Sequence, residues 1–187
     1  MNWHEHSELK SNQHALFGGS NYHWINYDED KLIEFYINQQ AKEEGTKLHS
    51  LASELINRGI KLAKSKKTFN SFVNDCIGFR MRSEQPLKYS DKFFGTADAI
   101  KFDDRKRKLM IFDLKTGKTP AHMEQLMVYS AFFCLEYNIP PHKIAIELRI
   151  YQNDDVLFYI PEPEEIWEIM STIEHHDKVL DNFINKE

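Results

Sequence analysis

Cysteine, glycine and proline are all scarce in this chain, and their scarcity narrows the possible classes of protein. The 187 residues include two cysteines, seven glycines and six prolines. Two cysteines cannot form a four-cysteine zinc site or an iron–sulfur cluster, so we expect no iron–sulfur cluster. With 41% apolar residues, the composition fits one ordinary globular domain over residues 1–187, which is large enough to fold without a disulfide or structural metal.

Long apolar runs are also missing. No stretch approaches the roughly 18 consecutive apolar residues of a membrane span, and the start, Met1–His6, lacks the basic-then-apolar order of a signal peptide. Both cysteines lie within apolar helical patterns. We therefore expect no membrane partner and a reducing, cytoplasmic location.

An excess of basic residues is absent as well, since the net charge is −5. Taken alone, this argues against nucleic acid as a partner. However, residues 162–187 carry eight acidic residues and two lysines, which leaves the rest of the chain close to neutral. Basic runs occur at 61–67 and at 105–108. They permit a phosphate-backbone partner, although such runs are more often solvated faces.

The first half of the chain predicts helices. Residues 1–27 have no clear periodicity and predict an irregular arm. Apolar residues then recur at helical spacing. The pattern predicts a helix capped by Asp28 or Asp30 and interrupted at Gly45, a second helix over 46–63, and a third from Thr68.

The second half predicts strands around a buried helix. The expected strands are 79–90 (broken at Pro86), 93–102, 108–115, 143–152 and 156–160. Residues 121–137 are apolar almost all round and predict a buried helix, and an amphipathic helix follows from Glu164. The predicted fold is one α/β domain with a central mixed sheet flanked by helices.

Charged residues in two neighbouring strands predict the chemistry. Asp113 and Lys115 end a strand without alternation, which is typical of a central strand, and they point to one face. A hairpin turning near Asp104 would bring Asp98 alongside this end. Two such carboxylates repel unless a hard cation lies between them, so Mg²⁺ or Mn²⁺ is the expected ion. The alternatives are that the Asp-x-Lys pair simply reaches solvent, and that Asp98 caps a bulge at Gly95.

Three further polar residues lie on predicted helices. His49 borders an apolar stripe, where a histidine is more often a satisfied core residue than a ligand. Gln125 and Tyr129 are four residues apart on the buried helix and therefore project together. Their partners could be backbone groups or a nucleotide.

These residues form an ordered series that resembles a known family. The series is Gly45-x-x-x-His49, Gly95-x-x-Asp98, Asp113-Leu114-Lys115 and Gln125-x-x-x-Tyr129. It is similar to the RecB-like branch of the PD-(D/E)xK nucleases, which includes the nuclease domains of RecB and AddAB, and short phage-type recombination exonucleases are closest in size. The resemblance spans about residues 45–152 and implies a restriction-endonuclease-like core.

The resemblance also implies roles for the residues. His49, Asp98, Asp113 and the Leu114 carbonyl would bind Mg²⁺ or Mn²⁺. Lys115 would orient or activate the attacking water, with Asp98 and Asp113 sharing the catalysis. Gln125 and Tyr129 would line the site against DNA. The expected function is a metal-dependent deoxyribonuclease, and specifically an exonuclease in DNA end processing and recombination.

The sequence also bears on other partners and functions. Gly117–Thr119 lacks the earlier glycine of a phosphate-binding loop, so any helicase or recombination partner must be a separate protein. One alternative is a catalytically inactive nuclease fold that binds DNA or a protein. A second is an interaction domain that docks through its acidic last helix. The choice between exonuclease and endonuclease action stays open at this point. The strand polarity, the number of metal ions and the oligomeric state also stay open.

Overall fold

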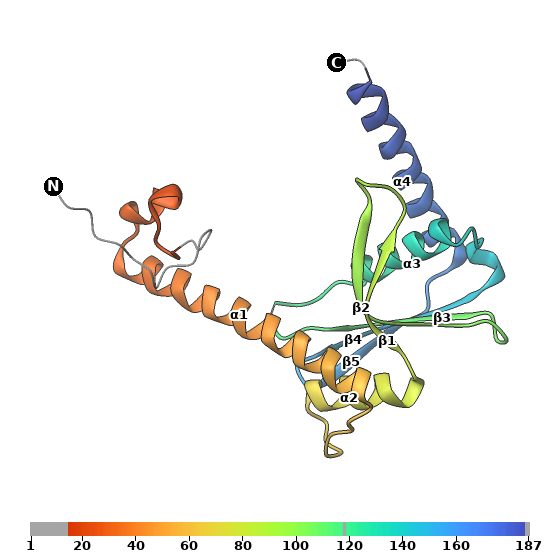
Figure 1. The fold of residues 1–187 in the computed structure, drawn as a ribbon, viewed down its shortest axis with the longest axis horizontal. Coiled ribbons are helices and arrows are strands. Elements are labelled where there is room, and N and C mark those ends of the chain that lie inside the picture. Colours follow the sequence, from red (N-terminus) through yellow and green to blue (C-terminus); the bar gives the residue numbers. More distant parts are fainter. Residues whose placement is uncertain (1–14, 118, 186–187) are drawn as a thin grey trace, which may run out of the picture. The chain divides into compact units, whose positions relative to one another are not determined.

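Two compact units make up the part of the chain that the structure describes. The computed structural model describes residues 15–117 and 119–185. The units are divided between Glu44 and Gly45, within the long helix α1 (Glu29–Arg58). Figure 1 shows the elements of both units along the chain.

The first unit is held by aromatic contacts. A 3₁₀ helix, η1 (Gly19–Asn26), precedes α1. The ring of Phe17 packs 6.0 Å from Trp24 and 5.9 Å from Phe35, measured between centroids. The Asp28 carboxylate accepts a hydrogen bond from the Lys31 amide, which confirms the predicted N-cap. The prediction of an irregular arm is wrong for Gly19–Asn26, and residues 1–14 lie outside the described residues.

The predicted helix break at Gly45 is wrong, because α1 runs through this residue without interruption. A glycine inside a helix costs about 1 kcal/mol relative to alanine, so it needs another reason. A Cβ at Gly45 would lie 2.8 Å from the Thr116 hydroxyl oxygen. The glycine therefore lets the loop after Lys115 approach the helix.

The helix α1 ends earlier than predicted. Gly59 adopts a left-handed backbone with φ of 67°. The Gly59 amide bonds the Ile56 carbonyl and the Ile60 amide bonds the Leu55 carbonyl. This pair of bonds is a Schellman motif, which terminates the helix at Arg58 rather than near Ala63.

A five-stranded mixed sheet forms the centre of the second unit, as predicted in outline. The strands lie in chain order, and only β3 and β4 are parallel to each other. The helix α3 (Glu124–Glu136) makes the crossover that a parallel pair requires. The strands are β1 (Arg82–Lys88), β2 (Phe94–Asp103), β3 (Lys108–Leu114), β4 (Ala145–Gln152) and β5 (Asp155–Tyr159).

Pro86 does not break its strand, contrary to the prediction. It lies inside β1 and pairs with Thr96 of β2. Because β1 is an edge strand, the missing proline amide removes no bond on the open side. Strand β1 starts at Arg82 because the helix α2 (Thr68–Phe79) extends through Phe79.

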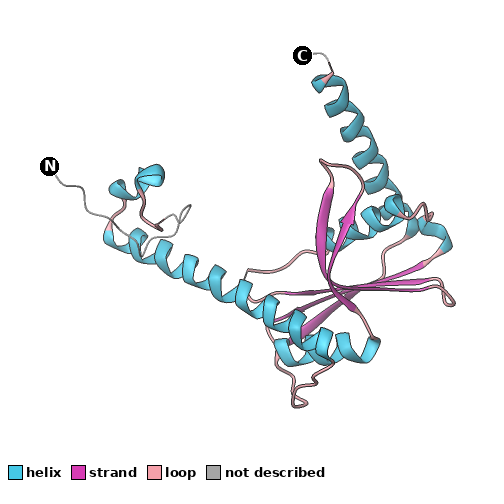
Figure 2. Cartoon of the chain, viewed as in Figure 1, coloured by secondary structure: helices cyan, strands magenta, loops and turns pink. Residues whose placement is uncertain are grey.

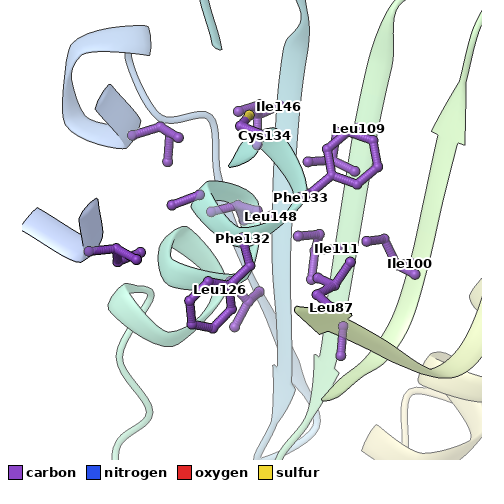
Figure 3. Close-up of a cluster of buried hydrophobic side chains, with 14 of the residues drawn as sticks. Leu87, Ile100, Leu109, Ile111, Leu126, Phe132, Phe133, Cys134, Ile146 and Leu148 are labelled. Carbon is purple, nitrogen blue, oxygen red and sulfur yellow. The ribbon is translucent and has the colours of Figure 1, made fainter. Parts of the chain in front are cut away.

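Helices cover both faces of the sheet (Figures 1 and 2), and each face has its own hydrophobic core. On one face, Leu109 and Ile111 of β3 pack with Leu126 and Phe132 of α3, as Figure 3 shows. On the other face, Met110 and Phe112 pack with residues of α2 and of the later part of α1. The strand β3 is thus covered on both sides, as its continuous apolar run predicted.

The last helix, α4 (Pro163–Ile184), begins with a capping box in which Glu162 and Glu165 satisfy each other's backbone amides. It packs against α3 through Ile166 and Ile173. Between residues 15 and 185, leaving out residue 118, none of the helices has the length and apolar character that crossing a membrane requires.

Candidate metal centre

The hairpin of β2 and β3 brings Asp98 to the end of β3. The last ladder pair is Ala99 with Phe112, so Asp98 comes next on β2 and Asp113 next on β3. Beyond this pair, the Asp98 side chain takes the place of a backbone carbonyl as hydrogen-bond acceptor. The Leu114 amide donates a hydrogen bond of 2.9 Å to Asp98 Oδ2. The predicted proximity of the two acidic residues is confirmed by this register.

His49 reaches the same carboxylate from α1. Its Nδ1 lies 3.3 Å from Asp98 Oδ2, and its side chain is 30% exposed. The hydrogen bond to Asp98 raises the pKa of His49, burial partly opposes this shift, and the charges of Asp98, Asp113 and Glu84 add to it. His49 is therefore the partner of an acid in the site and not an isolated core histidine.

Glu84 is a member of the site that the sequence analysis missed. Ligand atoms of His49, Glu84 and Asp98 all lie within 4.8 Å of one another, so the three side chains could hold one ion. Ser83 pairs with Ala99 and Gln85 with Ala97, which places Glu84 across from Asp98. Counting back from the β1–β2 turn would have found this position.

The backbone at Glu84 is strained. Its φ is 50°, in the left-handed region that non-glycine residues rarely adopt. Such positions cost of order 1–3 kcal/mol and gather at functional sites. Burial and the charge of Asp98 raise the pKa of the Glu84 carboxyl, and His49 partly offsets the shift. The strand thus holds an acidic residue where its charge is disfavoured.

Asp113 is the most buried of the acidic residues, with 2% of its surface exposed. Lys115 Nζ lies 2.9 Å from Oδ2 and donates a hydrogen bond of 3.2 Å to Oδ1. The contact to Oδ2 is not directed as a hydrogen bond, and no described residue supplies another. Burial and the charge of Asp98 raise the pKa of Asp113, and Lys115 only partly opposes them. A buried oxygen without a hydrogen bond is unusual and fits an atom that receives a cation.

Gln125 and Tyr129 hold the lysine. Lys115 Nζ donates a 2.7 Å hydrogen bond to Gln125 Oε1, and Gln125 Nε2 donates one of 3.1 Å to the Tyr129 hydroxyl. A Cβ at Gly95 would lie 2.8 Å from Tyr129 Cε1, so the glycine of this motif makes room for the tyrosine. Residues predicted to line the site therefore act on Lys115 through a short chain of contacts.

The donor set suits a hard divalent cation. Three carboxylates, Glu84, Asp98 and Asp113, share the site with Lys115 and His49, and two of the three have raised pKa values. Carboxylate oxygens are the preferred ligands of Mg²⁺ and, with histidine, of Mn²⁺. The compact ligand group contains His49 and Asp98, as predicted, but has Glu84 in place of Asp113. The role of the Leu114 carbonyl stays a prediction.

Comparisons with known proteins find no relative of this chain. No protein-family profile, curated protein or solved structure matches the chain. The geometry described above is therefore what supports any assignment of function.

Proposed function

We propose that this protein is a Mg²⁺- or Mn²⁺-dependent deoxyribonuclease with a restriction-endonuclease-like core. The single observation that carries the proposal is the excess of acidic groups around Asp98 at the end of β3, beside one lysine. A structural ion pair needs one acid for each base. Here Lys115 pairs with Asp113 and His49 with Asp98, which leaves the third carboxylate, Glu84, without a basic partner of its own, and a divalent cation would balance it.

The motif order supports the same proposal, because the residues that resemble the RecB-like nuclease series come from four separate segments and meet at one place. His49 comes from α1, Asp98 from β2, Lys115 follows β3, and Gln125 comes from α3. A bound Mg²⁺ or Mn²⁺ would supply a Lewis acid that polarises the phosphate.

The chain's own residues would carry the remaining steps. His49, Glu84 and Asp98 would hold the ion, and Asp113, paired with Lys115, would add a further carboxylate at the site. Lys115 orients the attacking water and stabilises the negative charge that develops on the phosphate oxygens. Gln125 accepts a hydrogen bond from the ammonium group, which fixes its direction. We further propose that the substrate is a DNA end, as the resemblance to recombination exonucleases implies.

The test uses end-labelled linear DNA and closed circular DNA with Mg²⁺ or Mn²⁺. The wild-type protein should cleave DNA only when the metal is present, and cleavage confined to the linear form would identify an exonuclease. Lys115→Met should lose about 10²–10³-fold in rate, the effect of removing one charge-stabilising donor. Lys106→Met, at an exposed lysine in the β2–β3 turn, is the matched control and should keep full activity.

Two outcomes would overturn the proposal. The first is a folded wild-type protein that cleaves neither form of DNA with either metal. The second is cleavage that survives unchanged in Lys115→Met, because the activity would then come from a contaminant.

A further inference from the structure

A cavity of about 230 Å³ adjoins the metal centre on the side of α2. Lys115 and Leu114, at the end of β3, form one wall. Leu48, the neighbour of His49 on α1, forms another, and Phe69 and Asn153 close the remainder. The volume is below the roughly 300–1,000 Å³ of sites that enclose a whole small-molecule ligand. It suits one part of a longer molecule, such as the base of a nucleotide.

Fixed contacts build this cavity. The Thr68 amide donates a 2.8 Å hydrogen bond to Asp154 Oδ1, and the Asp154 amide donates one of 2.7 Å to the Thr68 hydroxyl. These bonds join the first turn of α2 to the β4–β5 turn that carries Asn153. On the opposite wall, the Lys115 amide bonds the Tyr151 carbonyl. The walls therefore come from elements that are locked together.

A basic loop continues from the same wall. Residues 61–67 contain four lysines and no acidic residue, and Thr68 and Phe69 of the cavity follow directly. The loop backbone is tied to α2, because Asn70 Nδ2 donates to the Ala63 carbonyl and the Ser71 hydroxyl donates to the Ser65 carbonyl. The loop thus lies against the first turns of α2, and Figure 1 shows that it connects the end of α1 to the start of α2.

The lysines of this loop are available to a ligand. The side chains of Lys64, Lys66 and Lys67 are exposed, and none forms an ion pair or hydrogen bond with the described residues. An acidic residue, Asp154, lies close by, but its Oδ1 accepts two hydrogen bonds from Thr68. Lys92, by contrast, is paired with Asp177 and Asp181.

We infer that the DNA strand leaves the metal centre through this cavity and crosses the basic loop. The inference rests on the proposed nuclease function. The base next to the cleaved phosphate occupies the cavity against Phe69, since aromatic rings bind bases of any sequence by stacking. The following phosphates bind Lys64, Lys66 and Lys67, since lysines that contact phosphates supply sequence-independent affinity.

The test compares charge reversal in two places. The loop variant, Lys64→Glu/Lys66→Glu, reverses two charges on the proposed path of the DNA. The turn variant, Arg105→Glu/Lys106→Glu, makes the same change in net charge in the β2–β3 turn. This turn lies at the opposite end of β3, and both side chains there are exposed. Binding of a fluorescein-labelled 12-nucleotide single strand is measured by anisotropy over a range of salt concentrations, in a Lys115→Met background and without added metal, so that the strand stays intact. Cleavage is measured with the native lysine at position 115.

The loop variant should bind roughly tenfold more weakly, and the slope of log affinity against log salt should fall by about 1.4, or 0.7 for each lost phosphate contact. Its kcat/KM should fall with kcat preserved. The turn variant should match the parent protein in all three measurements. A loop variant that keeps the parent affinity and salt slope, or a turn variant that loses as much, overturns the inference.

The role of the cavity is tested by Phe69→Leu, which keeps an apolar side chain against the core. Loss of one stacked base should weaken binding by roughly 5- to 150-fold. Phe183→Leu, at an exposed phenylalanine of α4, is the control and should change nothing. Equal DNA affinity of the two variants would show that no base binds in the cavity.

These outcomes separate the inference from the proposed function. If the wild-type protein cleaves DNA while the loop variant behaves like its parent, the path is wrong and the nuclease assignment stands. If the wild-type protein cleaves nothing but binds DNA through the loop, the nuclease assignment fails and the path stands. Absence of both binding and cleavage overturns both.

Discussion

Buried acidic residues occur at both ends of the central strand β3, and the two ends treat them in opposite ways. At its start, Lys108 lies 2.6 Å from Glu147 Oε2, and Arg149 lies 2.6 Å from the other oxygen. At its end, Asp113 has only Lys115 as a basic partner and shares the space with Asp98. The first end has two bases for two acids, because Arg149 also lies 3.6 Å from Asp75, and the second end has more acids than bases.

The pKa directions express this difference. Burial raises the pKa of Glu147, but hydrogen bonds from Lys108 and Arg149 outweigh it and leave the pKa lowered. At Asp113 burial and the charge of Asp98 prevail over Lys115 and leave the pKa raised. A balanced cluster stabilises the fold, whereas groups with pKa values shifted toward the neutral form are concentrated at functional sites. Residue type does not separate the two clusters, because both combine carboxylates with lysine.

The largest effect is expected from neutralising Asp113. Asp113→Asn should lower the rate of DNA cleavage at least about a hundredfold, because charge stabilisation by a bound metal is worth several kcal/mol. The same variant should unfold at a higher temperature without metal. A raised folded-state pKa means that stability falls as pH rises through it, so removing the charge restores stability at neutral pH. Thermal unfolding with EDTA at pH 7 checks this, and a lower midpoint for the variant would contradict it.

Neutralising Glu147 should do the reverse. Glu147→Gln should lose about 2–3 kcal/mol of unfolding free energy at pH 7, since two basic side chains lose a largely buried partner. Because the folded-state pKa is lowered, this stability exists above the ordinary value of 4.5 and disappears as pH falls through the folded value. Urea unfolding at pH 7 and at pH 3 should show a gap that closes in acid. Cleavage measured at 20 °C should stay near the wild-type rate.

Glu84 should matter for metal affinity alone. Glu84→Gln removes one of three grouped ligands and should raise the metal concentration for half-maximal thermal stabilisation at least about tenfold. Its neighbour Gln85 offers a matched control, because Gln85→Glu adds an acidic residue on the opposite side of the strand. Titration of Mn²⁺ followed by thermal unfolding makes the measurement. If the Mn²⁺ concentration for half-maximal stabilisation is the same in Glu84→Gln as in the wild-type protein, Glu84 is not a metal ligand.

The smallest effect is expected at Gly95. Gly95→Ala places a Cβ 2.8 Å from Tyr129 and should cost about 1–3 kcal/mol through overpacking. Displacing Tyr129 also loosens Gln125 and Lys115, so cleavage should fall several-fold. Gly78→Ala, in α2 where a Cβ meets nothing within 4 Å, is the control and should keep activity. Equal activity of the two variants would show that the tyrosine does not position Lys115.

Local patterns in the sequence predicted much of the fold. The apolar run of β3, the capping residue Asp28 and the turns near 104 and 153 all act over a few residues, and the structure contains the corresponding elements. Errors occurred where a distant contact overrode the local signal. Gly45 reads as a helix break in isolation, but Thr116 explains it. Pro86 reads as a strand break, but an edge position accommodates it.

The sequence by itself determined which polar residues were candidates for one site, because His49, Asp98, Asp113 and Lys115 lie in or beside apolar or glycine-containing segments. Only the tertiary structure decided which of these residues contact one another. Glu84 joins the group because its own backbone is left-handed within the edge strand β1. Gln125 contacts Lys115 directly, and Tyr129 contacts Gln125. The physical reason is that spacing along a chain fixes the face on which a side chain lies, whereas its partner depends on strand register and on contacts between segments distant in sequence.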